Sequence, residues 1–221
     1  MNKEPFDIDY AVAATEEAVA PFPKAGMFEL FDEGYTSPFE MLVACLISIR
    51  TYDEVMLPVS RTLFALARTP HEMSHLTLTQ IEEAIAKSTF AESKAKQILE
   101  IAKQIVEAYD GELPCNKEVL VGFKGVGPKC AHLVLGIACQ EPYIAVDIHV
   151  HRVTNRWGYV ETKSPEQTMK ALEEKLPKRY WVDINRLLLP FGKHICKGQA
   201  PLCSRCPLLK MCEQRGVDGW R

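Results

Sequence analysis

The chain has 221 residues, with 26 lysines and arginines against 29 acidic residues, a formal net charge of −3 and a hydrophobic fraction of 47%. These values are typical of a globular protein that buries its core in one domain or in two small lobes. The sequence has no continuous apolar run long enough to span a bilayer, and its first residues lack the basic-then-apolar plan of a signal peptide. We therefore expect an intracellular protein of the cytoplasm or nucleoid.

The N-terminal half of the sequence carries clear helix signals. Residues 8–20 suit one helix that two prolines end. Ser37 and Pro38 form a cap and a first helical position before a segment that is hydrophobic nearly all round, as in a helix at the centre of a bundle. Asp53 is expected to cap the next helix, which runs to about residue 68 with a kink at Pro58.

Further helices follow, and no segment shows the alternation of a strand, so the predicted fold class is all-α. Thr77-x-x-Gln80 has the form of a capping box before an amphipathic stretch that ends near residue 88. Pro190 is expected to interrupt the last long helix. The other helices are predicted over residues 92–109, 128–139, 148–157, 164–176 and 181–196.

Residues 125–129 read as a tight turn that joins a short helix to a longer one. Gly125, Val126 and Gly127 supply the turn, since glycines adopt backbone angles that other residues resist. Lys129 then lies in the first helical turn, where unpaired N–H groups and the positive end of the helix dipole favour a phosphate. The same field disfavours an ammonium, and a neutral lysine is a nucleophile.

Asp147 is predicted to lie near this lysine. The helix after Pro128 carries the chain away by roughly 18 Å, and an extended segment over 141–146 can return it by about 20 Å. A simpler interpretation of each residue stays open, because a lysine in a first helical turn is usually solvated and Asp147 can serve only as a helix cap. His149 and His151 are two apart and make a poor metal pair.

The eight cysteines form two groups. Four are scattered in helical or turn contexts and are expected to be buried small hydrophobic residues, namely Cys45, Cys115, Cys130 and Cys139. The other four form the run C-x6-C-x2-C-x5-C, namely Cys196, Cys203, Cys206 and Cys212. Disulfides are improbable in an intracellular protein, so this run indicates zinc or an iron–sulfur cluster.

Together, the Gly-Val-Gly turn, Lys129, Asp147 and the cysteine run resemble the endonuclease III branch of the helix-hairpin-helix DNA glycosylases. The resemblance implies a two-lobed fold, with a six-helix barrel over residues 31–141 and a second lobe formed by 1–30 with 142–221. It also implies a [4Fe–4S] cluster on the four cysteines. The basic residues Lys197 and Arg205 within that loop would then face DNA, or else are merely solvated.

The resemblance further implies a base-excision-repair glycosylase with abasic-site lyase activity, with Lys129 and Asp147 as catalytic residues. Its partner would be duplex DNA carrying a damaged base or an abasic site, bound by a monomer. The net charge of −3 argues mildly against this partner, although basic residues dominate the C-terminal part of the chain. The alternatives are a non-catalytic or abasic-site-only DNA-binding protein, a glycosylase with altered base specificity and a zinc-dependent interaction module.

Two positions depart from the family pattern where the damaged base is recognised. Arg50 replaces a glutamine that fills the gap left by the flipped base, and Phe90 replaces a leucine wedge. An arginine can hydrogen-bond the orphaned base and a phenylalanine can stack, so both changes are workable. They leave the preferred base open, with oxidised pyrimidine as the family default. Alternatively, Arg50 is a solvated helix end and Phe90 a core residue.

Overall fold

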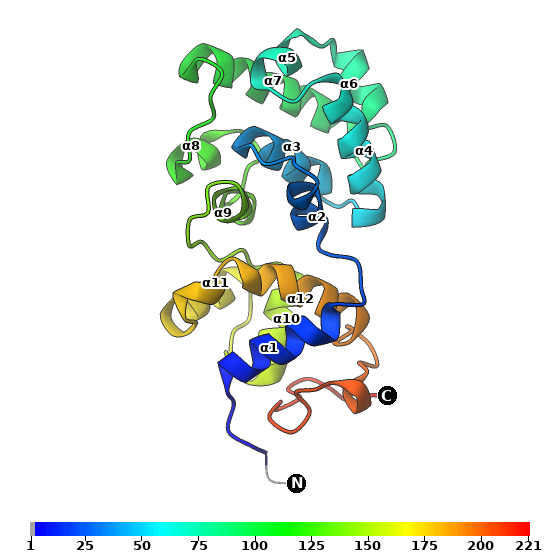
Figure 1. Cartoon of the computed structure of the whole chain (residues 1–221), viewed down its shortest axis with the longest axis vertical. Coiled ribbons are helices and arrows are strands. Elements are labelled where there is room, and N and C mark those ends of the chain that lie inside the picture. The colour runs from blue at the N-terminus through cyan, green and yellow to red at the C-terminus, as the bar shows by residue number, and fades with distance from the viewer. Residues whose placement is uncertain (1–2) are drawn as a thin grey trace. The chain divides into compact units, whose positions relative to one another are not determined.

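A computed structural model describes residues 3–221 and shows a chain built from helices (Figure 1). Within this range there are twelve α-helices, two short 3-10 helices and no strand, which confirms the predicted all-α class. The chain divides into two compact units, one formed by Gly26–Glu141 and the other by Pro142–Arg221 with the N-terminal segment up to Ala25. No helix in the described range is long and apolar enough to cross a membrane.

The unit Gly26–Glu141 is organised around α3 (Pro38–Ser48), as its composition predicts. Every residue from 39 to 47 is buried, and α3 packs against helices on several sides. Its start is fixed by a capping box, in which Ser37 Oγ accepts from the Glu40 N–H while the Glu40 carboxylate accepts from the Ser37 N–H. The other helices are α2 (Gly26–Asp32), α4 (Asp53–Leu66), α5 (Pro70–His75), α6 (Leu78–Ala84), α7 (Ala91–Tyr109), α8 (Lys117–Gly122) and α9 (Pro128–Ile137).

The other unit packs around an aromatic centre. Trp157 and Phe191 are almost fully buried, with ring centroids 6.3 Å apart in an edge-on arrangement. They come from α10 (Ile148–Trp157) and α12 (Asp183–His194), which pack against each other, while α1 (Ile8–Val19) packs on α12. The remaining helices are α11 (Pro165–Lys175), the 3-10 helix η1 (Lys178–Tyr180) and the 3-10 helix η2 (Cys203–Arg205).

Several local predictions are wrong. Asp53 is the first residue of α4, and Tyr52 holds the cap position without a side-chain cap hydrogen bond. Pro190 does not interrupt α12, because it is buried and packing across the helix tolerates the missing N–H. The helix α6 ends at Ala84, before the predicted boundary near residue 88, and the short helices α2 and α5 were not predicted.

Candidate functional site

The glycine turn lies between α8 and α9 and is anchored by two buried side chains. Phe123 and Val126 are 6% and 5% exposed, and the Val126 N–H donates to the Phe123 carbonyl at 3.1 Å. Gly125 has φ +81°, in the left-handed region, and a Cβ there would lie 2.5 Å from the Gln97 amide nitrogen. That amide donates to the Lys124 carbonyl, so a side chain at Gly125 would collide with the group that fixes the turn.

Gly127 contributes differently, because it leaves the outer side of the turn open. It is the cap residue of α9 with φ −91°, and no described atom lies within 4 Å of a Cβ built on it. No side chain caps the first turn of α9. The backbone N–H groups at this helix start therefore lack an internal side-chain acceptor, which is the arrangement that binds phosphates.

Lys129 is the second residue of α9, and its side chain is exposed, whereas residues 130–137 of the same helix are all buried. The helix packs along α3, so its axis is held by the core of its unit. The helix thus presents the exposed Lys129 amine beside an open turn.

Asp147 caps α10, as predicted. Its Oδ1 accepts from the N–H groups of His149 and Val150, both at 2.8 Å, and the residue is 8% exposed. The helix ends at Gly158, with φ +77°, which confirms the predicted stop. Lys129 and Asp147 belong to different units of the chain, so their proximity stays a prediction.

Arg50 and Phe90 occupy two turns of the unit Gly26–Glu141 that are linked to each other. The Arg50 guanidinium carbon lies 5.8 Å from the centre of the Phe90 ring. Phe90 is 58% exposed, so the alternative that it is a core residue is wrong. Arg50 is exposed too, and both residues have positive φ, 54° and 59°, a conformation that costs energy for a residue with a side chain.

The four cysteines of the C-terminal run line one pocket between the η2 segment and the end of α12. The pocket has about 320 Å³ of empty space, part of it open to solvent, and its other walls include Arg156, Trp157 and Phe191. No three His, Cys, Asp or Glu side chains among residues 3–221 converge tightly enough to form a single-ion site. Burial raises the pKa of Cys206 to about 12 and that of Cys212 to about 11.

Two arginines of α10 hold the start of this cysteine loop. Arg156 is 7% exposed and donates to the carbonyls of Lys197 at 2.5 Å and Gly198 at 2.8 Å, and its Nη1 lies 3.5 Å from Cys196 Sγ. Arg152 donates to the Gly192 carbonyl at 2.9 Å and to the Cys196 carbonyl at 3.2 Å. These guanidinium groups satisfy carbonyls left open where α12 ends.

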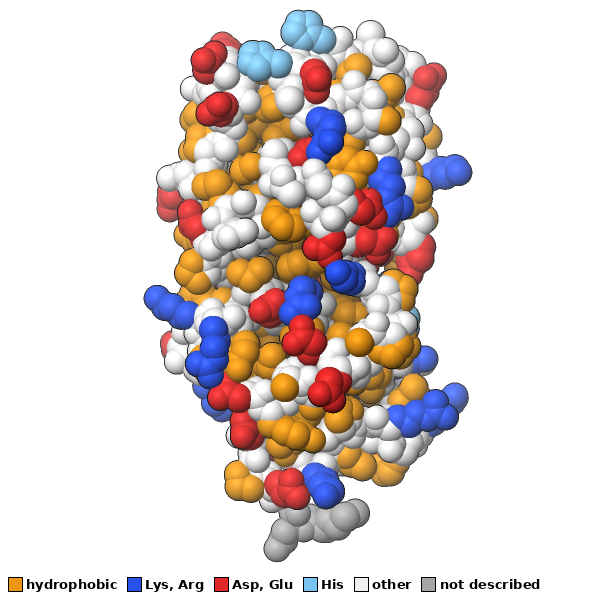
Figure 2. All heavy atoms as spheres, in the orientation of Figure 1, with side chains coloured by type: hydrophobic (Ala, Val, Ile, Leu, Met, Phe, Trp, Pro, Cys, Tyr) orange, Lys and Arg blue, Asp and Glu red, His pale blue; other side chains and the backbone are white. Residues whose placement is uncertain are grey.

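The C-terminal basic residues therefore provide less of a basic face than their number indicates. Arg152 and Arg156 are committed to the loop, and Arg186 pairs with Glu16 and Asp183. Lys197 and Arg205, in contrast, are exposed, as the sequence interpretation requires. On the face shown in Figure 2, acidic and basic side chains are interspersed.

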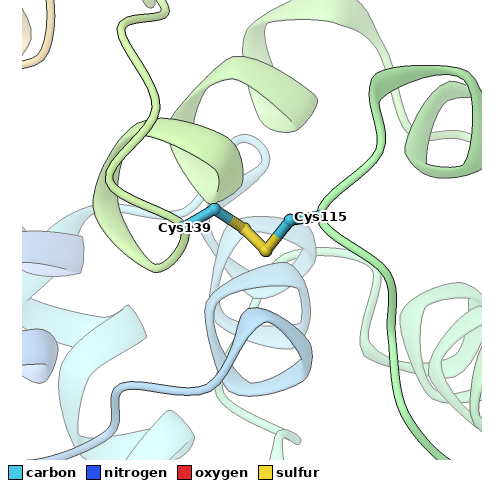
Figure 3. Close-up of a disulfide and its surroundings, with 2 residues drawn as sticks. All are labelled: Cys115 and Cys139. Carbon is cyan, nitrogen blue, oxygen red and sulfur yellow. A yellow bond between two sulfur atoms is a disulfide. The ribbon is translucent and has the colours of Figure 1, made fainter.

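The first group of cysteines behaves differently from the prediction. Cys45 and Cys130 are buried, as expected, but Cys115 and Cys139 are joined by a disulfide, with their Cα atoms 6.0 Å apart (Figure 3). Cys115 precedes α8 and Cys139 follows α9, so the bridge encloses the whole helix-turn-helix segment. The prediction failed because spacing along the chain does not show that the fold returns Cys139 to Cys115.

Comparison with known proteins shows which family the chain resembles. A family model described as "HhH-GPD superfamily base excision DNA repair protein" matches residues 43–178, which include the turn, Lys129 and Asp147. Endonuclease III of Thermotoga maritima is 41% identical over 178 residues, which cover 80% of this chain and 84% of that protein.

The chain belongs to the endonuclease III family. Two solved structures, a non-covalent endonuclease III–DNA complex and a trapped endonuclease III–DNA covalent intermediate, each match with a TM-score of 0.81 and 31% identity, over 94% of both chains. This chain is therefore a base-excision-repair DNA glycosylase with abasic-site lyase activity. The family resemblance predicted from the sequence is confirmed.

Sequence reasoning missed three features of this endonuclease III relative. It did not find the disulfide or the roles of Arg152 and Arg156 at the cysteine loop. It also missed Lys94, which is only 4% exposed beneath the Arg50 turn. The available signals were weak, because arginines and lysines in amphipathic helices usually face solvent and the partners of these residues lie 40 or more positions away in the sequence.

Proposed function

We propose that this endonuclease III relative releases an oxidised pyrimidine from duplex DNA and then nicks the strand through a Schiff base on Lys129. The observation that carries the proposal is the placement of Lys129, exposed at the start of an otherwise buried helix directly after an open glycine turn. Enzymes of this class without a lysine here would remove the base only, so Lys129 favours the bifunctional reaction.

In the proposed mechanism, the nucleotide first leaves the base stack. Lys129 Nζ attacks C1′, the C1′–base bond breaks, and the base departs with the bonding electrons. The amine then loses a proton and the C1′–O4′ bond breaks, with O4′ taking up a proton, which gives a ring-opened Schiff base. That Schiff base acidifies the neighbouring C2′–H, and loss of that proton expels the 3′ phosphate. Asp147 stabilises the cationic sugar and assists deprotonation of Lys129, using Oδ2, since Oδ1 accepts the two cap hydrogen bonds.

DNA binding is proposed to use three surfaces. The backbone N–H groups after Gly127 bind a phosphate near the damaged nucleotide, because the helix start is open there. Arg50 and Phe90 enter the duplex, Arg50 toward the orphaned base and Phe90 as a stacking wedge. Lys197 and Arg205, both exposed, contact further phosphates.

A [4Fe–4S] cluster is proposed for the cysteine pocket. All four thiols of the run line one pocket, and the run has only one short Cys-x-x-Cys pair, whereas structural zinc generally prefers two; this spacing fits an iron–sulfur cluster better than zinc. Cys196, Cys203, Cys206 and Cys212 would hold it. The cluster would supply a structural cross-link that keeps the loop with Lys197 and Arg205 in shape.

The test is borohydride trapping on two matched duplexes, one with a single thymine glycol and one with an abasic site. Wild-type protein is expected to form a covalent adduct with both. Lys129→Ala should abolish the adduct and lower strand cleavage by about 10³-fold or more. Lys103→Ala, which removes an exposed lysine from α7, is the matched control and should trap like the wild type.

The two duplexes separate the alternatives. An adduct on the abasic duplex alone would retain Lys129 as the lyase nucleophile and show that Arg50 and Phe90 have shifted the base preference. No wild-type adduct on either duplex, or full cleavage by Lys129→Ala, would overturn the proposed mechanism.

A further inference from the structure

A buried lysine lies directly beneath the turns that carry Arg50 and Phe90. Lys94 projects from the first turn of α7, is 4% exposed, and directs its ammonium to the end of α3. Its Nζ donates to the Ile47 carbonyl at 2.6 Å, the Ile49 carbonyl at 2.8 Å and Thr51 Oγ1 at 2.9 Å. An ammonium has three donor hydrogens, and each finds one acceptor here.

Core packing alone does not account for a lysine at this place. The three hydrogen-bond partners of Lys94 are neutral oxygens, and burial lowers the pKa of Lys94 to about 8. Burying a charge is costly, and an apolar side chain of similar length would fill the space without that cost. What an apolar side chain would not do is hold the last carbonyls of α3 and the Thr51 hydroxyl together.

The network continues from Lys94 into both turns. Thr51 Oγ1 also accepts from the Thr89 N–H at 3.2 Å, and Thr89 Oγ1 donates to the Arg50 carbonyl at 2.9 Å. Lys94 is thus connected by hydrogen bonds to residues on either side of Arg50 and to the residue before Phe90. Both Arg50 and Phe90 keep left-handed backbone angles, which persist only where the surroundings hold them.

We propose that Lys94 is a positioning residue that locks the Arg50 and Phe90 turns into one rigid unit for opening the DNA duplex. The proposal rests on the function proposed above, in which these two side chains enter the duplex. Lys94 itself does not touch DNA, since it is buried. Its contribution is that Arg50 and Phe90 reach the duplex already arranged, so less ordering is needed on binding.

The experiment compares three variants in single-turnover base release from duplex DNA with one thymine glycol. Lys94→Met keeps the length of the side chain and removes the donors, and it should slow base release about 10- to 100-fold. Thr89→Val removes only the hydroxyl that donates to Arg50 at an exposed position, and it should slow base release about 3-fold. Lys96→Met removes an exposed lysine of the same helix that pairs with Glu92, and it should match the wild type.

A double-mutant cycle separates positioning from a general structural role. In an Arg50→Ala, Phe90→Ala background, adding Lys94→Met should cause no further loss, because Lys94 acts only through those two residues. Nicking of a duplex that already carries an abasic site should fall less than about 3-fold in Lys94→Met, since no base must be unpaired. Additive losses, or equal losses on both duplexes, would overturn the proposal.

Failure of the proposal is distinguishable from failure of the proposed function. Wild-type protein that forms no borohydride adduct on either duplex would overturn both. Wild-type protein that traps normally, with Lys94→Met releasing the base within about twofold of its rate, would overturn only the role of Lys94. If Lys94→Met does not fold, Thr51→Val decides, because it removes the hydroxyl that accepts from Lys94 Nζ and from the Thr89 N–H. An unchanged rate in that variant contradicts the proposal.

Discussion

The glycine turn around Lys129 and the cysteine loop after α12 are built in different ways. The turn lies between two regular helices, and its conformation depends mainly on its own residues, chiefly Gly125 and the buried Val126, with one distant hydrogen bond from Gln97 to the Lys124 carbonyl. The cysteine loop has only one 3-10 turn of regular structure, and its start is held by distant donors such as Arg156. Local signals are enough for the first region, whereas the second depends on long-range contacts and, as we propose, on a bound cluster.

Removing a cysteine of the loop should give the largest effect. Cys203→Ser should abolish the bound iron and the visible absorbance of the proposed cluster. It should also lower the free energy of unfolding by about 3 kcal/mol or more, because metal binding contributes folding energy. Iron analysis and urea unfolding check it. The paired Cys115→Ser, Cys139→Ser variant should keep its iron. A Cys203→Ser protein with full iron content would contradict the proposed ligand set.

Removing the disulfide tests the other region. The bridge joins residues 24 apart, and its loss should lower the free energy of unfolding by about 3 kcal/mol, through the entropy of the unfolded chain. The measurement is urea unfolding of wild type and of Cys115→Ser, Cys139→Ser, each with and without dithiothreitol. Dithiothreitol should lower the free energy of unfolding of the wild type and leave that of the double variant unchanged. A wild type that is insensitive to dithiothreitol and has both thiols free would show that the bridge does not form in solution.

A surface contact of α1 should give the smallest effect. Asp9 Oδ1 accepts from the Tyr180 hydroxyl and from Arg179, both at 2.7 Å, and these two partners hold the pKa of Asp9 below its usual range. Its stabilisation is therefore present above the usual aspartate pKa of about 3.9 and is lost as the pH falls through the lower folded-state value.

Thermal unfolding at two pH values checks this contact. Asp9→Asn should unfold slightly earlier than wild type at about pH 6, and the difference should vanish at about pH 2.5. Glu17→Gln, which alters another exposed carboxylate of α1, is the control and should show no such pH-dependent difference. A difference for Asp9→Asn that persists at the lower pH would argue against an electrostatic origin.

Helix boundaries with a local chemical cause were predictable. The capping box at Ser37, the cap at Asp147 and the stop at Gly158 depend on residues within three or four positions, and all three are present. The short helix α5 also begins with a capping box, at Thr69 and Glu72, but six residues leave little periodicity to detect. Pattern reasoning therefore finds the long helices and misses two of the short ones, α2 and α5.

The functional site was predictable to the extent that single residues carry its chemistry. Lys129 was selected from the glycine turn and the family resemblance, and Phe90 from the resemblance alone. Both are exposed, as their proposed roles require. The roles of the buried Lys94 and of Arg156 at the cysteine loop were not predictable. Each side chain donates to carbonyl groups that are distant in the sequence and that only folding brings near. The same holds for the pairing of Cys115 with Cys139.

The left-handed backbone at Arg50 and Phe90 sets stability against function. Glycine at either position would relax the backbone, which is worth up to about 1 kcal/mol. On the proposed function, the same change would remove a side chain that opens the duplex. Selection for heat resistance alone would therefore favour variants with weaker lesion recognition, a trade-off that engineering of this fold has to take into account.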